Sequence, residues 1–261
     1  MLSKLSKMIL LLSVTYIVVI VCPGFAAIDS KSIVAIWLCD EGQGTTVGDA
    51  SGHGHDGKIV GDVKWADGKF GKALEFLGKG GTRVEIPNDD SLTMDAWTIT
   101  AWVKLQPPPG GDWAVIVVKD PGNGVQTYAL DLNKGGEVNA EVSSGGNWSG
   151  CQSTTLVYDN VWYFLAASYD KTTLRVYVDG NKEGEQIFNK GDVNTAPVTI
   201  GGRMDSSQPL LGLVDDIGMF NTALSVDDLK SIMDKGVGKV TGLSAVEPSS
   251  KLATTWGQLK L

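Results

Sequence analysis

The segment TLRVYVDG, residues 173–180, alternates apolar and polar side chains along its length. In an extended strand, Leu174, Val176 and Val178 lie on one face, and Arg175 and Tyr177 lie on the other. The Asp-Gly pair at positions 179 and 180 supplies the residues that a two-residue hairpin turn prefers. The segment therefore predicts a strand with one buried face, followed by a hairpin.

The same alternation appears in WTITAWVKL, residues 97–105, where Trp97, Ile99, Ala101 and Val103 share one face. Short runs of this kind recur along the chain, with Gly, Asp and Asn residues between them. They lie at 33–39, 72–78, 82–87, 97–105, 113–120, 127–133, 137–144, 161–170, 173–180, 197–202 and 210–220. So many short strands predict an all-β chain folded as two stacked antiparallel sheets.

One helix is predicted, in SVDDLKSIMDKG at residues 225–236. Ser225 is a favourable N-cap, and Gly236 can end the helix. An apolar stripe is expected to pack on the edge of the sandwich, formed by Val226, Leu229, Ile232 and Met233. Residues 237–261 lose the hydrophobic pattern and are predicted to be a tail, either loosely ordered or docked through Trp256.

Residues 1–26 are predicted to be an export signal. Lys4 and Lys7 precede the apolar run MILLLSVTYIVVIVC. A stretch of small residues that ends at Ala26 follows this run. The alternative is a retained membrane anchor, since the run is near the lower limit for a spanning helix. With cleavage, we expect a secreted, cell-surface or periplasmic protein that has no membrane span.

The chain is acidic, with a formal net charge of −8. Removing residues 1–26 takes away Lys4 and Lys7, which leaves 20 basic and 30 acidic residues. Such a surface repels phosphates, so nucleic acid is excluded as a partner. Cys39 and Cys151 remain after cleavage, and they form either a disulfide or two packed free thiols.

The order of these landmarks resembles the laminin-G-like jelly rolls of the concanavalin A-like lectin and glucanase superfamily, of the exported bacterial type. The matching segments are AIWLCDEGQGTTVGDASGHGHDGKIVG, WADGKFGKALEFLGKGGTRVEIPNDDSLTMDAWTITAWVK, WYFLAASYDKTTLRVYVDG and GLVDDIGMFNTALSVDDLKSI, which cover most of residues 33–235. The resemblance implies a two-sheet antiparallel jelly-roll sandwich over residues 28–236, with one short C-terminal helix and the tail after it.

The two histidines of the chain, His53 and His55, lie in DASGHGHDGK, residues 49–58. In similar proteins this stretch is a glycine-rich turn with asparagine at those positions. Because His and Asn tolerate positive φ, we interpret both histidines as turn residues. A zinc site needs three or four ligands, and the chain offers no further histidine.

The resemblance also implies a structural calcium ion, clamped between this loop and the late strand that carries Val-Asp-Asp. On that model the ligands come from Asp40, Asp49, Asp215 and Asp216, with loop oxygens near His53. The alternative is that Asp215 and Asp216 cap hydrogen bonds at a bend in the strand.

Catalysis is not expected. The glucanases of the superfamily carry a Glu-x-Asp-x-Glu strand, and EVNAE at residues 137–141 places Glu137 and Glu141 on one face. Asn139 replaces the middle acid and cannot share a proton as an aspartate would. A glycoside hydrolase using Glu137 and Glu141 is the alternative.

We therefore predict a non-catalytic module that binds carbohydrate or an extracellular protein. The residues expected to contact a sugar lie in or beside loops: Trp113, Tyr128 and Trp148, with Asp112, Asn123, Asn147 and Asp205. The competing hypothesis is a structural or adhesion scaffold with a flat surface and no sugar site.

Overall fold

The computed structural model describes residues 28–122, 125–189 and 191–243. The predicted export signal and residues 244–261 of the predicted tail lie outside the described residues. The strands are β1 (Ile33–Trp37), β2 (Thr46–Val47), β3 (Gly57–Val60), β4 (Val63–Asp67), β5 (Lys72–Leu77), β6 (Arg83–Ile86), β7 (Trp97–Leu105), β8 (Ala114–Lys119), β9 (Tyr128–Leu132), β10 (Glu137–Ser144), β11 (Asn147–Leu156), β12 (Trp162–Tyr169), β13 (Thr173–Val178), β14 (Asn181–Ile187), β15 (Val198–Ile200) and β16 (Leu211–Phe220). The helices are the 3-10 helices η1 (Ser30–Ser32) and η2 (Asp90–Leu92) and the α-helices α1 (Val226–Lys235) and α2 (Val237–Thr241).

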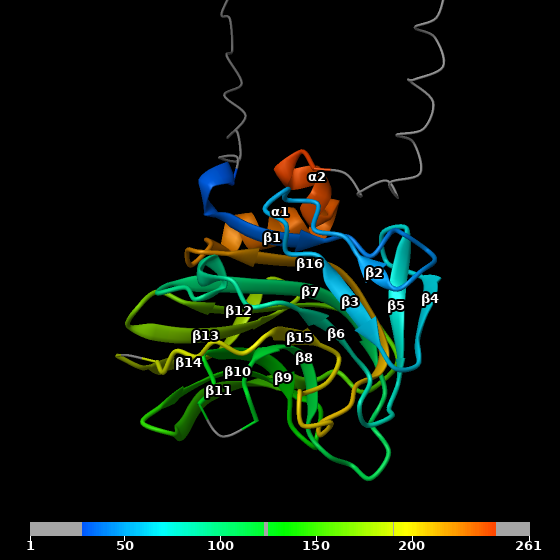
Figure 1. The fold of residues 1–261 in the computed structure, drawn as a ribbon. Helices are drawn as coiled ribbons and strands as arrows, with labels where there is room; N and C mark the ends of the chain where they lie inside the picture. Colours follow the sequence, from blue (N-terminus) through cyan, green and yellow to red (C-terminus); the bar gives the residue numbers. More distant parts are fainter. Residues whose placement is uncertain (1–27, 123–124, 190, 244–261) are drawn as a thin grey trace, which may run out of the picture.

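These strands form two antiparallel sheets stacked face to face (Figure 1). Sheet A has the order β14-β13-β12-β7-β16-β5-β4, and β1 pairs with β16. Sheet B has the order β11-β10-β9-β8-β15-β6-β3-β2. The predicted all-β sandwich is therefore confirmed.

Alternating strand residues fill the space between the sheets. On β7, Trp97, Ile99 and Val103 belong to the core between the sheets, whereas Trp102 lies on the other face of sheet A. On β13, Leu174 is likewise in the core between the sheets. The two-residue period in the sequence thus assigned both strands to the correct faces.

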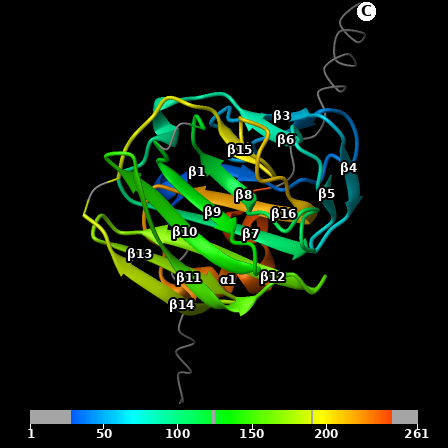
Figure 2. The ribbon, with the colours of Figure 1, turned by 90° about the horizontal axis from the view of Figure 1, so that it is seen from below.

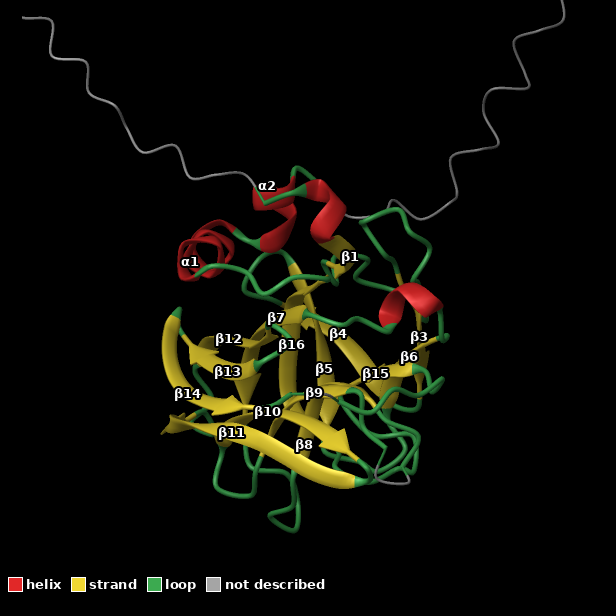
Figure 3. Ribbon diagram, turned by 90° about the vertical axis from the view of Figure 1, so that its left-hand side faces the viewer, coloured by secondary structure: helices red, strands yellow, loops and turns green. Residues whose placement is uncertain are grey.

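The outer face of sheet A is covered by the helices. Figure 3 shows α1 and α2 on the same side of the sandwich. Leu229 and Ile232 of α1 pack against Trp102 and Phe164 of sheet A in a second apolar cluster. Ser225 caps α1 as predicted, but Val226 is 40% exposed and lies outside the apolar stripe.

The β13–β14 hairpin has the predicted turn. Asp179 and Gly180 both have positive φ, +47° and +71°, which is the geometry of a type I′ turn. The structure differs from the sequence prediction at β11 and β14, which were not predicted as strands. Both are at sheet edges and present many polar side chains to solvent, so they lack the apolar alternation that marks a half-buried strand.

The predicted tail also begins later than expected. Residues 237–241 form α2, and Val237 is buried in the apolar cluster beneath the helices. The backbone N–H of Val237 donates to Asp216 Oδ2 at 2.6 Å, which ties α2 to β16. Across the described part of the chain, no helix is long and apolar enough to span a membrane.

Candidate functional site

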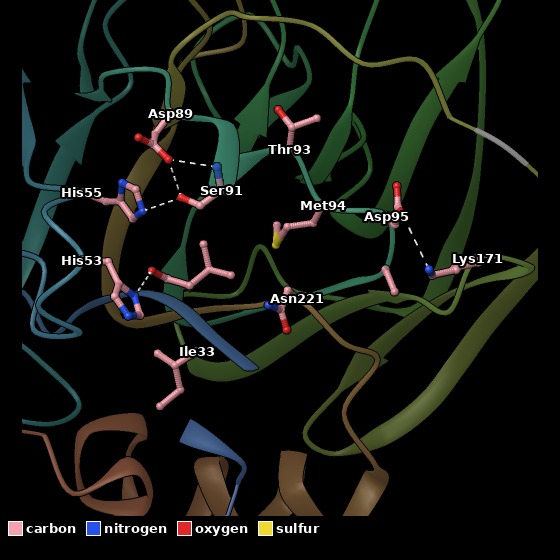
Figure 4. A pocket seen from close by; sticks show the side chains of 12 residues that line it. Ile33, His53, His55, Asp89, Ser91, Thr93, Met94, Asp95, Lys171 and Asn221 are labelled. Atoms are coloured by element: carbon pink, nitrogen blue, oxygen red, sulfur yellow. Dashed lines mark hydrogen bonds and ion pairs between the residues drawn. The ribbon is translucent and has the colours of Figure 1, made fainter. Parts of the chain in front are cut away.

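A cavity of about 740 Å³ opens at one rim of the sandwich, beside the two histidines. Figure 4 shows His53 and His55 on one side of the cavity and Asp95 and Lys171 on the other, with Met94 between them. The sequence of the histidine segment predicted a turn, and the family resemblance implied a calcium site there, but neither predicted a cavity. The cavity depends on segments that are far apart in sequence, so no local pattern revealed it.

Asp49 shapes the histidine turn. Its Oδ1 accepts hydrogen bonds from the backbone N–H groups of Ile36 (3.0 Å) and Ser51 (2.9 Å), and its Oδ2 accepts from that of His55 (3.1 Å). The positive φ values of the turn belong to Gly52 (+81°) and Gly54 (+86°), not to the histidines. The prediction that His53 and His55 occupy left-handed positions was therefore wrong, because the glycines between them take that geometry.

His55, Ser91 and Asp89 form a hydrogen-bonded chain in the cavity wall (Figure 4). The Ser91 hydroxyl donates to Asp89 Oδ1 over 2.6 Å, and Ser91 Oγ lies 2.9 Å from His55 Nε2. Because the hydroxyl proton goes to the carboxylate, we assign the proton between His55 and Ser91 to Nε2. The Ser91 hydrogen bond also lowers the pKa of Asp89.

This order of groups does not form a nucleophile. In a Ser-His-Asp triad the imidazole stands between the hydroxyl and the carboxylate and removes the hydroxyl proton. Here the hydroxyl stands in the middle, so His55 donates to Ser91 instead of activating it. The three groups hold the wall of the cavity.

His53 lies 3.0 Å from the Val34 carbonyl through Nδ1, which leaves its Nε2 free to accept a hydrogen bond.

A second group of polar side chains lies on the outer face of sheet B, which Figure 2 shows from below. Asp131 of β9 and Asn139 and Glu141 of β10 point away from the core, because Val138 and Ala140 fill the alternate inward positions. Asn139 Nδ2 donates to Asp131 Oδ1 at 3.0 Å.

Arg203 reaches the same face from the connection between β15 and β16. It forms an ion pair with Asp120, and both side chains are buried. Its guanidinium lies over the ring of Trp148, 5.1 Å from the ring centroid, and Trp148 is 44% exposed. We define the polar patch as Gln126, Asp131, Asn139, Glu141, Trp148 and Arg203.

Several buried atoms of the polar patch have no hydrogen-bond partner among the described residues. They are Oε1 of Gln126, Oδ1 of Asn139 and Nε of Arg203, whereas the Gln126 side chain interacts with the Glu141 carboxyl and partly offsets the rise of its pKa. Buried polar atoms are nearly always paired, so this concentration marks a place where water or a polar ligand completes the hydrogen bonds. Burial raises the pKa of Glu141, and burial together with the charge of Glu141 raises that of Asp131.

Glu137 and Glu141 lie four residues apart on β10, which is the spacing of the glucanase pattern, and Asn139 stands between them where that pattern has an acid. The Glu137 carboxyl faces Gly135 and lies near Tyr158. Asp131 is a nearer carboxyl neighbour of Glu141, and it was not singled out from the sequence because the pairing of β9 with β10 brings them together.

The residues predicted to contact a ligand are divided between three places. Asn147 and Trp148 begin β11, and Asp205 lies near both Gly122 and Arg203, so Trp148 belongs to the polar patch and Asn147 and Asp205 flank it. Trp113 precedes Ala114, which pairs with Leu132 at the opposite end of sheet B from Trp148.

Tyr128 lies in the core with no exposed surface. Its hydroxyl donates to the Leu92 carbonyl at 2.9 Å, and its ring packs against Trp97. It therefore offers no ring face to a ligand. Asp112 is exposed next to Trp113, and Asn123 lies outside the described residues.

The residues predicted to bind calcium are engaged mainly in backbone hydrogen bonds. Asp49 and His53 serve the turn described above, and Asp40 Oδ1 accepts from the Lys72 N–H at 2.8 Å. Within residues 28–122, 125–189 and 191–243, no three His, Cys, Asp or Glu side chains are grouped to hold a metal ion. The Asp49 carboxylate oxygens and His53 Nδ1 are engaged in the turn, and the calcium site stays a prediction.

Asp215 keeps one open oxygen. Its Oδ2 accepts from the backbone N–H groups of Lys69 (2.8 Å) and Phe70 (2.9 Å), whereas Oδ1 is buried and has no partner in the described part of the chain. Burial and the charge of Asp216 raise the pKa of Asp215 to about 8, and burial and the charge of Asp40 raise that of Asp216 to about 6. Asp215 Oδ1 therefore fits either a proton or a cation.

The comparison with protein families matches residues 78–230 to the model of the concanavalin A-like lectin/glucanases superfamily. No curated protein matches the chain in sequence. Solved structures share the fold at low identity. Domain 4 of AbnA, an extracellular arabinanase from Geobacillus stearothermophilus solved with arabinotriose, is 20% identical with a TM-score of 0.63, over 77% of this chain and 98% of that domain.

Two toxin structures share the fold as well. The binding domain of Paraclostridial Mosquitocidal Protein 1 is 13% identical with a TM-score of 0.65. A structure of botulinum neurotoxin type C, described as depending on two ganglioside molecules for cell entry, is 12% identical with a TM-score of 0.62. Each match covers 78% of this chain and 52% or 51% of the toxin chain, so this chain spans about half the length of those structures.

Proposed function

Because the chain belongs to the concanavalin A-like lectin/glucanases superfamily, we propose that it is a non-catalytic module that binds carbohydrate through the polar patch. The observation that carries this proposal is the group of buried atoms on Gln126, Asn139 and Arg203 that have no partner among the described residues, beside the exposed ring of Trp148. Sugar hydroxyls both donate and accept hydrogen bonds, and an aromatic face packs against the C–H groups of a sugar ring. A few convergent polar groups next to an apolar surface are typical of small-ligand sites.

The charges of the polar patch favour a neutral sugar. Arg203 is balanced by Asp120, and the raised pKa values of Asp131 and Glu141 increase the fraction of these carboxyls that carry a proton. A protonated carboxyl donates a hydrogen bond and adds no charge. We propose that Asn147 and Asp205, which lie next to Trp148 and Arg203, bind hydroxyls at the edge of the patch.

We also propose that the protein works outside the cytoplasm. The predicted export signal supports this, as does the arabinanase domain, which belongs to an extracellular protein. That domain was solved with arabinotriose, which makes arabinotriose a rational first ligand to test. Binding to an extracellular protein, without a sugar, is the second candidate function and is an outcome of the same experiment.

A glycan array tests the proposal. Wild type is compared with Trp148→Ala and with Trp113→Ala, which removes a tryptophan at the opposite end of sheet B. We expect wild type and Trp113→Ala to bind the same glycans, and Trp148→Ala to bind about tenfold more weakly, because the ring face is lost. Loss of binding only in Trp113→Ala would place the site elsewhere. A blank array for wild type would favour a protein partner.

Calcium is a separate proposal, in which a calcium ion binds Asp215 Oδ1 in place of a proton. Calcium takes several of its ligands from backbone carbonyls and water, so a site with few carboxylates is chemically reasonable. The melting temperature is measured above pH 8 with calcium chloride and with a chelator. A rise with calcium in wild type that is absent in Asp215→Asn supports the site, and equal melting temperatures argue against it.

A further inference from the structure

The cavity beside the histidines continues along the rim of the sandwich. Met94, Asp95 and Lys171 also line a neighbouring cavity of about 290 Å³, whose lining includes Trp97 and Tyr169. The two cavities therefore adjoin, and we call them together the rim groove. None of the described residues that line it belongs to the polar patch, so the rim groove is a separate place on the surface.

Lys171 and Asp95 face each other where the two cavities meet (Figure 4). Their charged atoms are 3.5 Å apart, beyond the roughly 2.7–2.9 Å of a close charge-assisted hydrogen bond. The side chains are 64% and 91% exposed, so the pair contributes little to folding. Both groups keep unused hydrogen-bonding capacity toward the groove.

Lys171 is held in an unfavourable backbone conformation. Its φ is +78°, in the left-handed region that glycine and asparagine adopt more readily than lysine. The turn is held in place by Asp170, whose Oδ1 accepts from the N–H groups of Thr172 and Thr173. Strain of this kind persists most often where a side chain has a task other than packing.

We propose that the rim groove is a second saccharide-binding site, in which neighbouring hydroxyls of a neutral sugar chain bond to Lys171 and Asp95. One hydroxyl accepts a hydrogen bond from Lys171 Nζ, and the adjacent hydroxyl donates to the Asp95 carboxylate. Two vicinal hydroxyls match a donor and an acceptor that stand side by side. The choice of a sugar as ligand rests on the proposed function, but the location of this site does not.

The rest of the groove fits such a ligand. His53 Nε2 adds an acceptor at one end, and Met94 and the exposed side chain of Val193 supply apolar surface along the groove. Asp89, Asp95 and Asp192 outnumber Lys171 among the charged residues of the lining, so an acidic sugar would be repelled. Because two adjoining cavities form the groove, the ligand is expected to be longer than one sugar ring.

Titration calorimetry with arabinotriose, mannotriose, cellotriose and maltotriose tests the site in the full chain. The polar patch is first disabled with Trp148→Ala, and Lys171→Gly or Asp95→Asn is then added. We expect Trp148→Ala to retain binding of at least one trisaccharide, and each added change to weaken that binding about tenfold. Lys171→Gly relieves the strained φ, so its melting temperature should be equal to or above that of wild type. Lower affinity without lower stability separates a binding role from a structural one.

The control is the exposed ion pair of Lys79 and Asp62, which lines neither cavity. Lys79→Gly and Asp62→Asn should leave trisaccharide affinity unchanged. If Trp148→Ala abolishes all binding that wild type shows, the rim groove is not a sugar site and the polar patch remains one. If Lys171→Gly abolishes binding and Trp148→Ala has no effect, the polar patch fails and the rim groove stands. A wild type that binds none of the four trisaccharides overturns the rim groove proposal.

Discussion

The carboxyl group of Asp215 is buried at the bend of β16, and one of its oxygens is unpaired among the described residues. The sequence marked Asp215 as a metal ligand or a cap for hydrogen bonds. Its Oδ2 does cap two backbone N–H groups, of Lys69 and Phe70. Asp49, which was also predicted to bind metal, accepts hydrogen bonds from three backbone N–H groups in a turn. An aspartate in a Gly-rich loop suits both roles, and only its surroundings decide between them.

Asp215→Asn should change how stability depends on pH. The pKa of Asp215 is about 8 in the folded state, against 3.8 for an unperturbed aspartate. Between these values the folded protein holds a proton that the unfolded chain has lost, so the free energy of unfolding falls as pH rises. Asparagine lacks this titration and keeps an oxygen for the N–H groups of Lys69 and Phe70. At pH 8 the variant should be more stable than wild type by on the order of 2 kcal/mol.

Urea denaturation at several pH values between 4 and 8 measures the effect. Asp216 also has a raised pKa, about 6, so a shallower slope up to that pH should persist in the variant. Identical slopes in both proteins would show that Asp215 is ionised in the folded state.

Among the elements, helix α1 was predictable from local sequence alone. Its boundaries depend on a capping box in which the Asp228 N–H donates to Ser225 Oγ at 3.1 Å and the Ser225 N–H donates to Asp228 Oδ2 at 3.2 Å. These contacts join residues three positions apart, so the sequence carries the whole signal. Strands β11 and β14 are the opposite case, because their polar sequences become strands only through pairing with β10 and β13.

Ser225→Ala should destabilise the protein by about 1 kcal/mol, because the first turn of α1 loses its side-chain acceptor. The cost should register in global unfolding, since Leu229 and Ile232 of this helix cover the outer face of sheet A. Guanidinium denaturation gives the difference. Ser225→Thr keeps a hydroxyl at the cap and should recover most of the lost stability. A variant with threonine that is as unstable as the alanine variant would argue against the cap.

For the whole molecule, the sandwich holds together without a bond between Cys39 and Cys151. Both are free and buried in the core between the sheets, in the part of the chain that is described. Burial raises the pKa of both thiols, and the pKa of Cys151 rises to about 11. Buried thiols with raised pKa values react slowly, because the thiolate is the reactive form. The sequence left a disulfide and two packed thiols as alternatives, and the structure selects the packed thiols.

A reductant should therefore leave the melting temperature unchanged. Mass spectrometry after treatment with iodoacetamide should find Cys39 and Cys151 unmodified in the native protein and alkylated in urea. A melting temperature that falls by several degrees in dithiothreitol would reveal a bond between them. Alkylation of native protein at either position would show that the core opens more often than its packing implies.

The sequence by itself determined the two-layer β architecture, the inward faces of β7 and β13, the turn at Asp179 and Gly180, and the start of α1. Each of these follows from residues within one strand, turn or helix, where the spacing of side chains carries the information. The polar patch and the rim groove were decided by the tertiary structure. Asp131 meets Glu141, Arg203 meets Trp148, and Lys171 meets Asp95 only because strand pairing and loop packing bring distant segments together. Contacts of that kind leave no periodic trace in a single sequence.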